Sequence, residues 1–280
     1  YITARSYESY RNRRINDVLR SDDNITIEDL KQLHFDNYSM KAAESLPWML
    51  RQLNGADLSF KEKDIINQLE SWDYMFDVDS DPATYYNIWF NQLFSITWDE
   101  IKISNDHNVS LKYPTNYATI KLMKAQPDHL FFDIEGTSKK ETAQDLSLIS
   151  FREMLKEVEE INSEGDLSWG SHKGTFVGHQ LRIKALGAYD LPSGGNAGDV
   201  VNATGKNHGP SQRLIVEMDP MGVKAWGHYP GGQSGNPGSR YYDNMVDAWT
   251  NGQYYDLLFM TAQDTSHPRI IFSQKITGAK

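Results

Sequence analysis

The 280-residue sequence contains no cysteine and no apolar stretch long enough to cross a membrane. The first absence excludes a disulfide framework and a thiolate metal site. A membrane-spanning helix needs about 20 consecutive apolar residues, so the absence of a long apolar stretch argues against a transmembrane helix and a signal sequence. A chain without cysteine is compatible with the periplasm, and we expect a periplasmic or secreted protein.

Positive charge is also in short supply, with 28 Lys and Arg against 38 Asp and Glu and a formal net charge of -10. Nucleic-acid binding requires a basic face, so this balance argues against such a partner. The length is sufficient to bury a core as one large domain or two smaller ones. The 15 Tyr and 7 Trp residues raise the alternative of a noncatalytic, aromatic-rich module that binds glycans or peptides. Most of these aromatics recur at helical spacing, which favours core packing instead.

Helical periodicity dominates the first part of the chain. Apolar residues at spacings of three and four predict a helix over residues 7–20. A Ser or Thr followed three residues later by an acidic residue predicts a capped helix start, and proline suits the first helical position. The predicted starts are Thr26 with Asp29, Ser59 with Glu62, Asp81 with Pro82, and Ser138 with Glu141, the last opening a helix to Asn162. Trp48 and Trp72 are predicted to be buried anchors.

After Gly165 the pattern changes toward the two-residue alternation of strands. Strands are predicted within residues 181–185, 213–218, 223–229 and 269–274. The chain therefore divides into a mainly helical part, residues 1–165, and a strand-rich part, residues 166–280. Together they predict an α+β fold in one continuous unit.

The segment after the strand predicted at 223–229 has an unusual composition. Residues 231–238, which we call the glycine loop, contain four glycines with Ser, Asn and Pro. This composition predicts positive backbone φ angles and tight turns. Apolar residues spaced by three and four over residues 239–249 predict a short amphipathic helix. The loop is either a structural crossing over a sheet edge or a place where the backbone passes close to another group.

This segment resembles the C-terminal signature of the penicillin acylase family, a group of N-terminal nucleophile hydrolases that includes acyl-homoserine lactone acylases. Members typically read Gly-Gly-Gln-Ser-Gly, a Pro/Gly turn, Ser-Pro-His-Tyr, and then an amphipathic helix ending near a Trp. The residues kept here are Gly231, Gly232, Gln233, Ser234, Gly235, Ser239, Tyr242 and Trp249. Arg240 and Tyr241 stand where the family has Pro and His, so no role of that histidine carries over.

Further matches occur in the order that the family shows. Trp169 to His172 resembles the family's Trp-Gly-x-x-His motif, and a Gly-x-Ser-x-Arg pattern before a strand contributes Ser211 and Arg213. Residues 10–15 resemble the segment after the family's oxyanion-hole asparagine. The resemblance implies that Arg14 takes the place of an arginine that supports the active site.

Two histidines, His172 and His179, lie close enough in sequence to share a metal. No carboxylate or third histidine stands at a recognisable ligand spacing, so histidines that hold loops by hydrogen bonds are favoured, and no metal site is predicted. Ser234 is not predicted to be a nucleophile. The elbow pattern is Gly-x-Ser-x-Gly, whereas Gly235 follows the serine directly, and no order of Asp and His completes a triad.

The resemblance implies the C-terminal part of a β subunit within a four-layer αββα sandwich. In this family autoproteolysis exposes an N-terminal serine, and its α-amine, with a pKa of about 7.7 to 8.0, acts as the base. That serine and the asparagine are expected upstream of Tyr1, so the chain is expected to be a processed or excised part.

The implied partners are the α subunit and the earlier part of the β subunit. The implied substrates are N-acylated small molecules, such as penicillins or acyl-homoserine lactones, which connects the family with antibiotics and quorum quenching. No cofactor is expected in this chain, and the resemblance allows calcium in the full enzyme.

Overall fold

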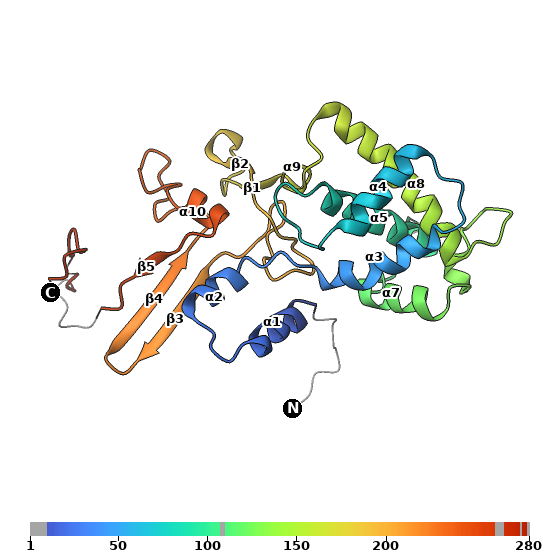
Figure 1. Ribbon diagram of the computed structural model, residues 1–280. Helices are drawn as coiled ribbons and strands as arrows, with labels where there is room; N and C mark the ends of the chain where they lie inside the picture. The colour runs from blue at the N-terminus through green and yellow to red at the C-terminus, as the bar shows by residue number, and fades with distance from the viewer. Residues whose placement is uncertain (1–9, 107–109, 261–265, 275, 279–280) are drawn as a thin grey trace.

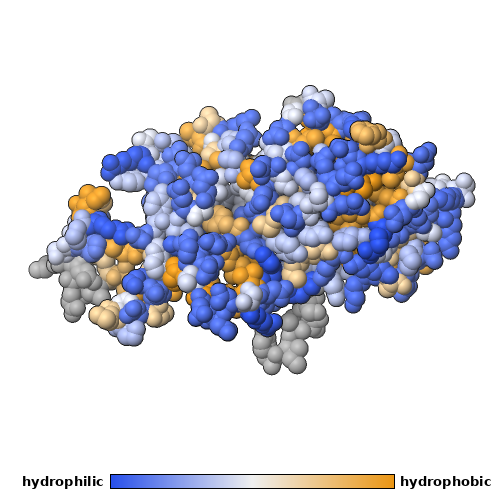
Figure 2. Space-filling model, in the orientation of Figure 1, coloured by the Kyte–Doolittle hydropathy of each residue, from blue (hydrophilic) through white to orange (hydrophobic). Residues whose placement is uncertain are grey.

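The computed structural model describes residues 10–106, 110–260, 266–274 and 276–278. Helices α3, α4, α5, α7 and α8 gather at one end of the molecule, and a three-stranded sheet lies at the other, with α1 and α2 between them (Figure 1). Hydrophilic side chains cover most of the visible face, with apolar patches between them over the helical end (Figure 2). Among the helices in the described ranges, none combines the length and the apolar character needed to cross a membrane.

The helical part is built around α5 and α8, which pack against each other. Trp89 of α5 is fully buried, its indole Nε1 donates to the Ser147 carbonyl at 3.1 Å, and its ring meets Phe151 edge-on at 5.0 Å. The helices of this part are α1 (Tyr10–Ser21), α2 (Ile27–Leu33), α3 (Met40–Gln52), α4 (Phe60–Ser71), α5 (Asp81–Thr97), α6 (Asp99–Asp106), α7 (Asn116–Ala125), the 3₁₀ helix η1 (Leu130–Phe132) and α8 (Ala143–Glu164). Trp72 is buried as predicted, and Trp48 is partly buried against the same core.

Of the four predicted helix starts, two are confirmed and two are wrong. Thr26 and Ser59 both cap their helices with the reciprocal bonds of a capping box. The start predicted at Asp81 is wrong by one residue. Ser80 is the N-cap, and its hydroxyl accepts from the Ala83 amide at 3.3 Å, so Asp81 is already helical.

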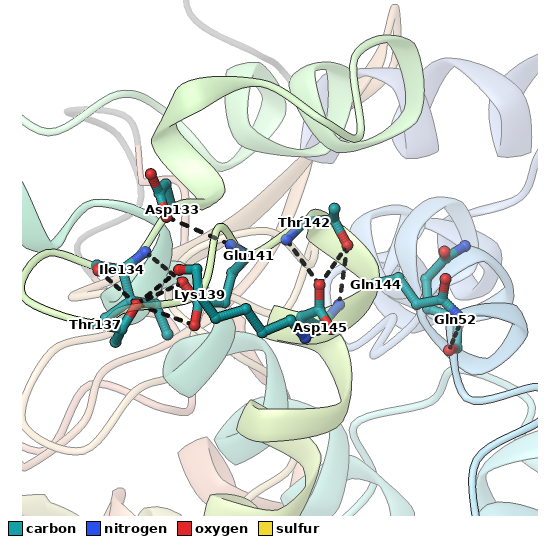
Figure 3. Close-up of polar contacts among 9 residues, drawn as sticks. All are labelled: Gln52, Asp133, Ile134, Thr137, Lys139, Glu141, Thr142, Gln144 and Asp145. Atoms are coloured by element: carbon teal, nitrogen blue, oxygen red, sulfur yellow. Dashed lines mark hydrogen bonds and ion pairs between the residues drawn. The ribbon is translucent and has the colours of Figure 1, made fainter.

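The start predicted for α8 at Ser138 is wrong, because the same sequence pattern occurs again four residues later. Thr142 is the N-cap and forms the capping box with Asp145, whose carboxylate accepts from the Thr142 amide at 2.9 Å (Figure 3). Glu141 instead accepts from the Ile134 amide at 3.1 Å and from the Thr137 hydroxyl at 2.9 Å (Figure 3). The buried carboxylate of Glu141 is therefore committed to the preceding turn.

The strand-rich part contains two small antiparallel sheets, one of β1 and β2 and one in the order β3-β4-β5. The strands predicted at 213–218 and 223–229 are confirmed as β3 and β4. The elements are α9 (Trp169–Lys173), β1 (Thr175–Val177), η2 (Lys184–Leu186), β2 (Ala188–Leu191), β3 (Arg213–Asp219), β4 (Gly222–His228), α10 (Val246–Asn251) and β5 (Tyr255–Leu257).

Two other strand predictions are wrong. Residues 181–185 form turns and the start of η2, because Arg182 takes a positive φ of 57° that no extended strand has. Residues 269–274 form no strand, and the third strand is β5, where Leu257 pairs with Ala225. Alternating sequence alone does not supply a partner strand, and β5, which was not predicted, is the strand that pairs with the second edge of β4.

The three-stranded sheet has one face that is apolar and open. Leu214, Val216 and Met218 of β3 are 46%, 43% and 80% exposed. Their cross-strand partners on β4 are Gly227, Ala225 and Val223, so the same face carries only apolar groups along both strands. Arg213 and Ile215 point to the opposite face and are buried, on the side where α2 packs.

Candidate functional site

Residues 193–205, which we call the buried loop, run between the helical part and the three-stranded sheet without regular structure. Much of the loop is buried, including Ser193, Asp199, Val200, Asn202 and Thr204. A buried loop must satisfy its own peptide groups, because water does not reach them. Side chains from α1 and α9 donate to carbonyls of the loop, and Arg213 of β3 donates to two of its side chains. Two of the predicted signature residues, Trp169 and Arg213, are among these donors.

Helix α9 supplies two donors to the loop. The indole Nε1 of Trp169 donates to the Gly195 carbonyl at 2.8 Å. The amine of Lys173 donates to the carbonyls of Gly194 at 2.6 Å and Thr204 at 3.1 Å. Burial lowers the pKa of Lys173 to about 7, while the carbonyl oxygens around its Nζ favour the ammonium form. In the described part of the chain no carboxylate pairs with this amine.

Gly195 is required at its position for two reasons. Its φ is +83°, and a Cβ placed there would lie 2.1 Å from the Asn202 carbonyl oxygen. The two limbs of the buried loop therefore approach so closely that no side chain fits between them.

Arg213, at the start of β3, reaches the same loop from the sheet side. Its Nη2 donates to Asn202 Oδ1 at 2.7 Å, and Asn202 Nδ2 donates to Asn37 Oδ1 at 2.9 Å. The guanidinium lies over the Phe35 ring at 4.0 Å. Burial lowers the pKa of Arg213 to about 10, so the group remains a cation at neutral pH. The chain of contacts runs on to Asp77, which accepts from Asn37 Nδ2 at 2.7 Å.

Helix α1 joins this network through its arginines. Arg14 binds Asp36 through Nε at 3.0 Å and Nη2 at 2.6 Å, and its guanidinium lies over the Tyr38 ring at 4.5 Å. The Asp36 carbonyl in turn accepts from the Asn202 amide at 2.9 Å. Arg11 contacts the buried loop directly, donating to the Val200 carbonyl at 3.1 Å. Arg14 therefore reaches the buried loop through one intermediate residue.

His172 does not take part in the network. A Trp-Gly-x-x-His spacing places the last residue at position 173, and Lys173 occupies that position in this chain. His172 is half-buried beside an open cleft of about 650 Å³ that Asp166, Ser171 and Asp190 also line. Burial is the main cause that lowers its pKa. In this protein the last position of the motif is therefore the buried Lys173, and the neighbouring His172 lines the cleft.

His179 lines a different cavity from His172, so the two histidines do not share a site. Within the described ranges, no group of three or more His, Asp or Glu residues is arranged to hold a metal ion.

The glycine loop forms a second group of signature residues. The prediction of positive φ angles in this loop is wrong. All of residues 231–238 are described, and none of them has a positive φ. What requires glycine is a close backbone approach, because a Cβ at Gly232 would lie 2.1 Å from the Tyr241 carbonyl oxygen. The predicted helix is also shorter than expected: α10 starts at Val246, and residues 239–245 form turns and bends.

The hydroxyls of this loop are used locally. Ser234 Oγ accepts from the Asn236 amide at 3.1 Å, and Ser239 Oγ accepts from the Tyr241 amide at 3.2 Å. The Tyr242 hydroxyl donates to the Leu186 carbonyl at 2.8 Å, which ties the segment to η2. The side chains of Gln233 and Ser211 are exposed. Of the signature residues, only Trp169 and Arg213 are therefore brought together at the buried loop.

The sequence motifs missed Lys173, Asn202 and Asn37, which complete the network. Lys173 could have been found by counting the motif spacing strictly. Asn202 and Asn37 are 165 positions apart, and their contact has no local signal.

The described fold is a mixed helical and sheet structure with an acylase-like arrangement. It resembles a thermostable penicillin G acylase from Alcaligenes faecalis with a TM-score of 0.54 and 11% identity. The likeness covers 94% of this chain and 53% of the acylase chain, so this chain spans about half of that length. The sequence matches the penicillin amidase family over residues 1–266, and the chain belongs to that family. No curated protein matches it.

Lys173→Met should lower the free energy of unfolding by about 2 to 4 kcal/mol, because it leaves buried carbonyls without a donor at about 1 to 3 kcal/mol each. Urea unfolding of the complete protein, followed by tryptophan fluorescence, measures the change. Lys156, which is exposed on α8 and pairs with Glu153, is the matched control, and Lys156→Met should stay within about 0.5 kcal/mol. Equal stabilities of the two variants would show that the buried loop does not need the amine.

Two histidines lie where α2 meets the sheet. His34 Nδ1 is 2.6 Å from the Tyr254 hydroxyl, and the His228 ring lies 4.7 Å from the Tyr254 ring. Burial, followed by the charge of Arg213, lowers the pKa of His34 below 6.5. Burial also lowers the pKa of His228, where Arg213 and His34 add to the effect against the hydrogen bond to Gln253.

Because these folded-state pKa values are depressed, the unfolded chain binds more protons below pH 6.5, and stability is lost as the pH falls. We expect a lower Tm at pH 5.5 than at pH 7.5, with the loss reduced in His34→Gln. His208 is exposed, and His208→Gln should leave the loss unchanged. The same pH dependence in all three proteins would contradict the assignment.

Proposed function

We propose that the complete protein hydrolyses the amide bond of N-acylated small molecules, and that this chain is the C-terminal part of its β subunit. The observation that carries the proposal is the family match over residues 1–266. The acylase fold supports it, and the 53% coverage of the acylase chain fits a protein with further parts.

The open face of the sheet supports a larger assembly. A face with Leu214, Val216 and Met218 at 46%, 43% and 80% exposure is unfavourable in water and suits burial against another layer. The four-layer αββα sandwich supplies such a layer as a second sheet. Its strands come from the α subunit and the earlier part of the β subunit.

The chemistry rests on a serine upstream of this chain, exposed by autoproteolysis. Its α-amine serves as the base, the serine attacks the amide carbonyl, and amide groups hold the oxyanion. Ser234 is unsuited to the role, because its nitrogen is a backbone amide that donates to the Tyr241 carbonyl at 3.0 Å and is not a free α-amine. The residues of this chain act as support, with Arg14 holding Asp36 next to the buried loop.

Penicillins and acyl-homoserine lactones are the substrate classes, which makes antibiotic conversion or quorum quenching in the periplasm the biological setting. The described residues contain no group of three or more His, Asp or Glu side chains arranged to hold a metal ion, so they offer no carboxylate cluster for calcium. We propose that any calcium ion in the complete enzyme takes its carboxylate ligands from the other parts.

A noncatalytic aromatic-rich module is the second candidate, and the burial of the aromatics disfavours it. A glycan-binding surface needs aromatic rings exposed in a row. The largest aromatic side chains of the helical part are buried instead, including Trp89, Tyr86, Phe90 and Phe151.

The complete protein should release the free amine from a phenylacetyl amide or from a long-chain acyl-homoserine lactone, and the isolated 280 residues should not. Detection of primary amine over time measures both. A variant of the complete protein with alanine at the processed N-terminal serine is the control and should be inactive. Turnover by the isolated chain would overturn the placement of the nucleophile.

Arg14→Lys in the complete enzyme should keep the fold and reduce kcat by a factor that corresponds to about 2 to 4 kcal/mol. A lysine cannot reproduce the two bonds to Asp36, because it lacks the planar fork of donors. Arg13, on the same helix and paired with Glu44 at 2.6 Å, is the matched control, and Arg13→Lys should change kcat little. We also expect little change for Arg11→Lys. Equal kcat values in the three variants would show that Arg14 has no supporting role in catalysis.

A further inference from the structure

A pocket between residues 177–188 and the glycine loop has no part in the proposed hydrolysis. Its volume is about 650 Å³, which lies within the range of about 300 to 1,000 Å³ typical of small-molecule sites. One wall comes from the turns and η2 around His179 and Leu186, and the other from the glycine loop and the start of α10. Segments more than 40 positions apart in sequence thus enclose a single space.

The walls of the pocket are fixed before any ligand arrives. The Tyr242 hydroxyl donates to the Leu186 carbonyl at 2.8 Å, which joins one wall to the other. The glycine loop is held at both limbs, since the Ser234 amide donates to the Tyr241 carbonyl at 3.0 Å and the Met245 amide to the Gly231 carbonyl at 2.8 Å. A preformed pocket loses little conformational entropy when it binds.

The glycines keep the pocket open. Gly231 and Gly235 both line it, and a Cβ at either position would meet no heavy atom within 4 Å. Neither residue has a positive φ, so the backbone itself does not demand glycine there. The missing side chains therefore leave space that a ligand can use, unlike Gly232, where the backbone approach alone explains the residue.

The lining combines an apolar body with one negative charge. Val177, Ala188 and Val246 supply apolar surface, and Asp243 is the acidic side chain among the described lining residues. Two nearby cations are directed at aromatic rings, with Lys184 over Tyr189 at 5.9 Å and Arg240 over Tyr241 at 4.6 Å. Neither of these cations lines the pocket.

His179 adds a hydrogen-bond donor to the same lining. Its Nδ1 accepts from the Leu181 amide at 3.3 Å, so the neutral imidazole carries its proton on Nε2. The net charge of -10 adds a long-range attraction for cations. Asp243 and the net charge favour a ligand with positive charge and a small apolar portion, while the His179 donor remains for a ligand acceptor or water.

We propose that this pocket binds a small molecule that carries an ammonium group on a compact apolar body, with the ammonium beside Asp243 and the apolar body against Val177, Val246 and the Tyr242 ring. The site is separate from the buried loop and does not depend on amide hydrolysis.

Ligand-observed NMR titration of the complete protein with benzylamine tests the proposal, with benzoate as a probe of the same ring and opposite charge. Benzylamine should bind about fivefold more tightly than benzoate, the size expected for an exposed ion pair. Asp243→Asn should remove this preference. Asp247, exposed on α10 and outside the pocket, is the matched control, and Asp247→Asn should keep it.

Gly235→Val should weaken benzylamine binding at least about tenfold by filling the pocket, since 1.4 kcal/mol is a tenfold change in Kd. Gly238 lies in the same loop outside the lining, and Gly238→Val should bind as the unmodified protein does. Thermal unfolding checks that both glycine variants fold. If Gly235→Val does not fold, the Asp243→Asn result decides the outcome. Failure of benzylamine to bind, equal binding of benzoate, or an unchanged Kd in both Asp243→Asn and Gly235→Val would overturn the proposal.

Discussion

The need to satisfy the peptide groups of the buried loop governs how the two parts of this chain fit together. Lys173, Trp169 and Arg11 all donate to its carbonyls, and each comes from a helix outside the loop. A buried carbonyl without a donor is costly, so these side chains are held where the loop passes. The loop thereby fixes α1 and α9 relative to each other and to β3.

Arg213 shows why the loop and the sheet form one unit. A buried guanidinium is unfavourable unless its donors are used and its charge is compensated. Here Asn202 accepts from it at 2.7 Å and the Phe35 ring lies 4.0 Å away, so polar and aromatic groups replace a carboxylate. Because Asn202 also donates to Asn37, the sheet is connected through this residue to the segment before α3.

Local sequence patterns predict helix starts correctly where the contacts that fix the start are local. The capping boxes at Thr26 and Ser59 need only four consecutive residues, and both were predicted correctly. The start predicted for α8 is wrong because Ser138 and Thr142 both have an acidic residue three positions later. Glu141 accepts hydrogen bonds from the preceding turn and so cannot complete a capping box with Ser138, which leaves Thr142 as the N-cap. The family resemblance came from motifs, whereas the network around Asn202 depends on contacts between distant positions and could not be read from any one segment.

The open sheet face has a consequence for how the protein assembles. The core of the helical part is formed mostly by residues 40–161, so its apolar side chains are covered by residues of this chain. The hairpin of β3 and β4 pairs locally, yet Leu214, Val216 and Met218 remain exposed in this chain. In the proposed assembly a second layer would cover this face, so a chain that lacks that layer would present an apolar hairpin to other unassembled chains.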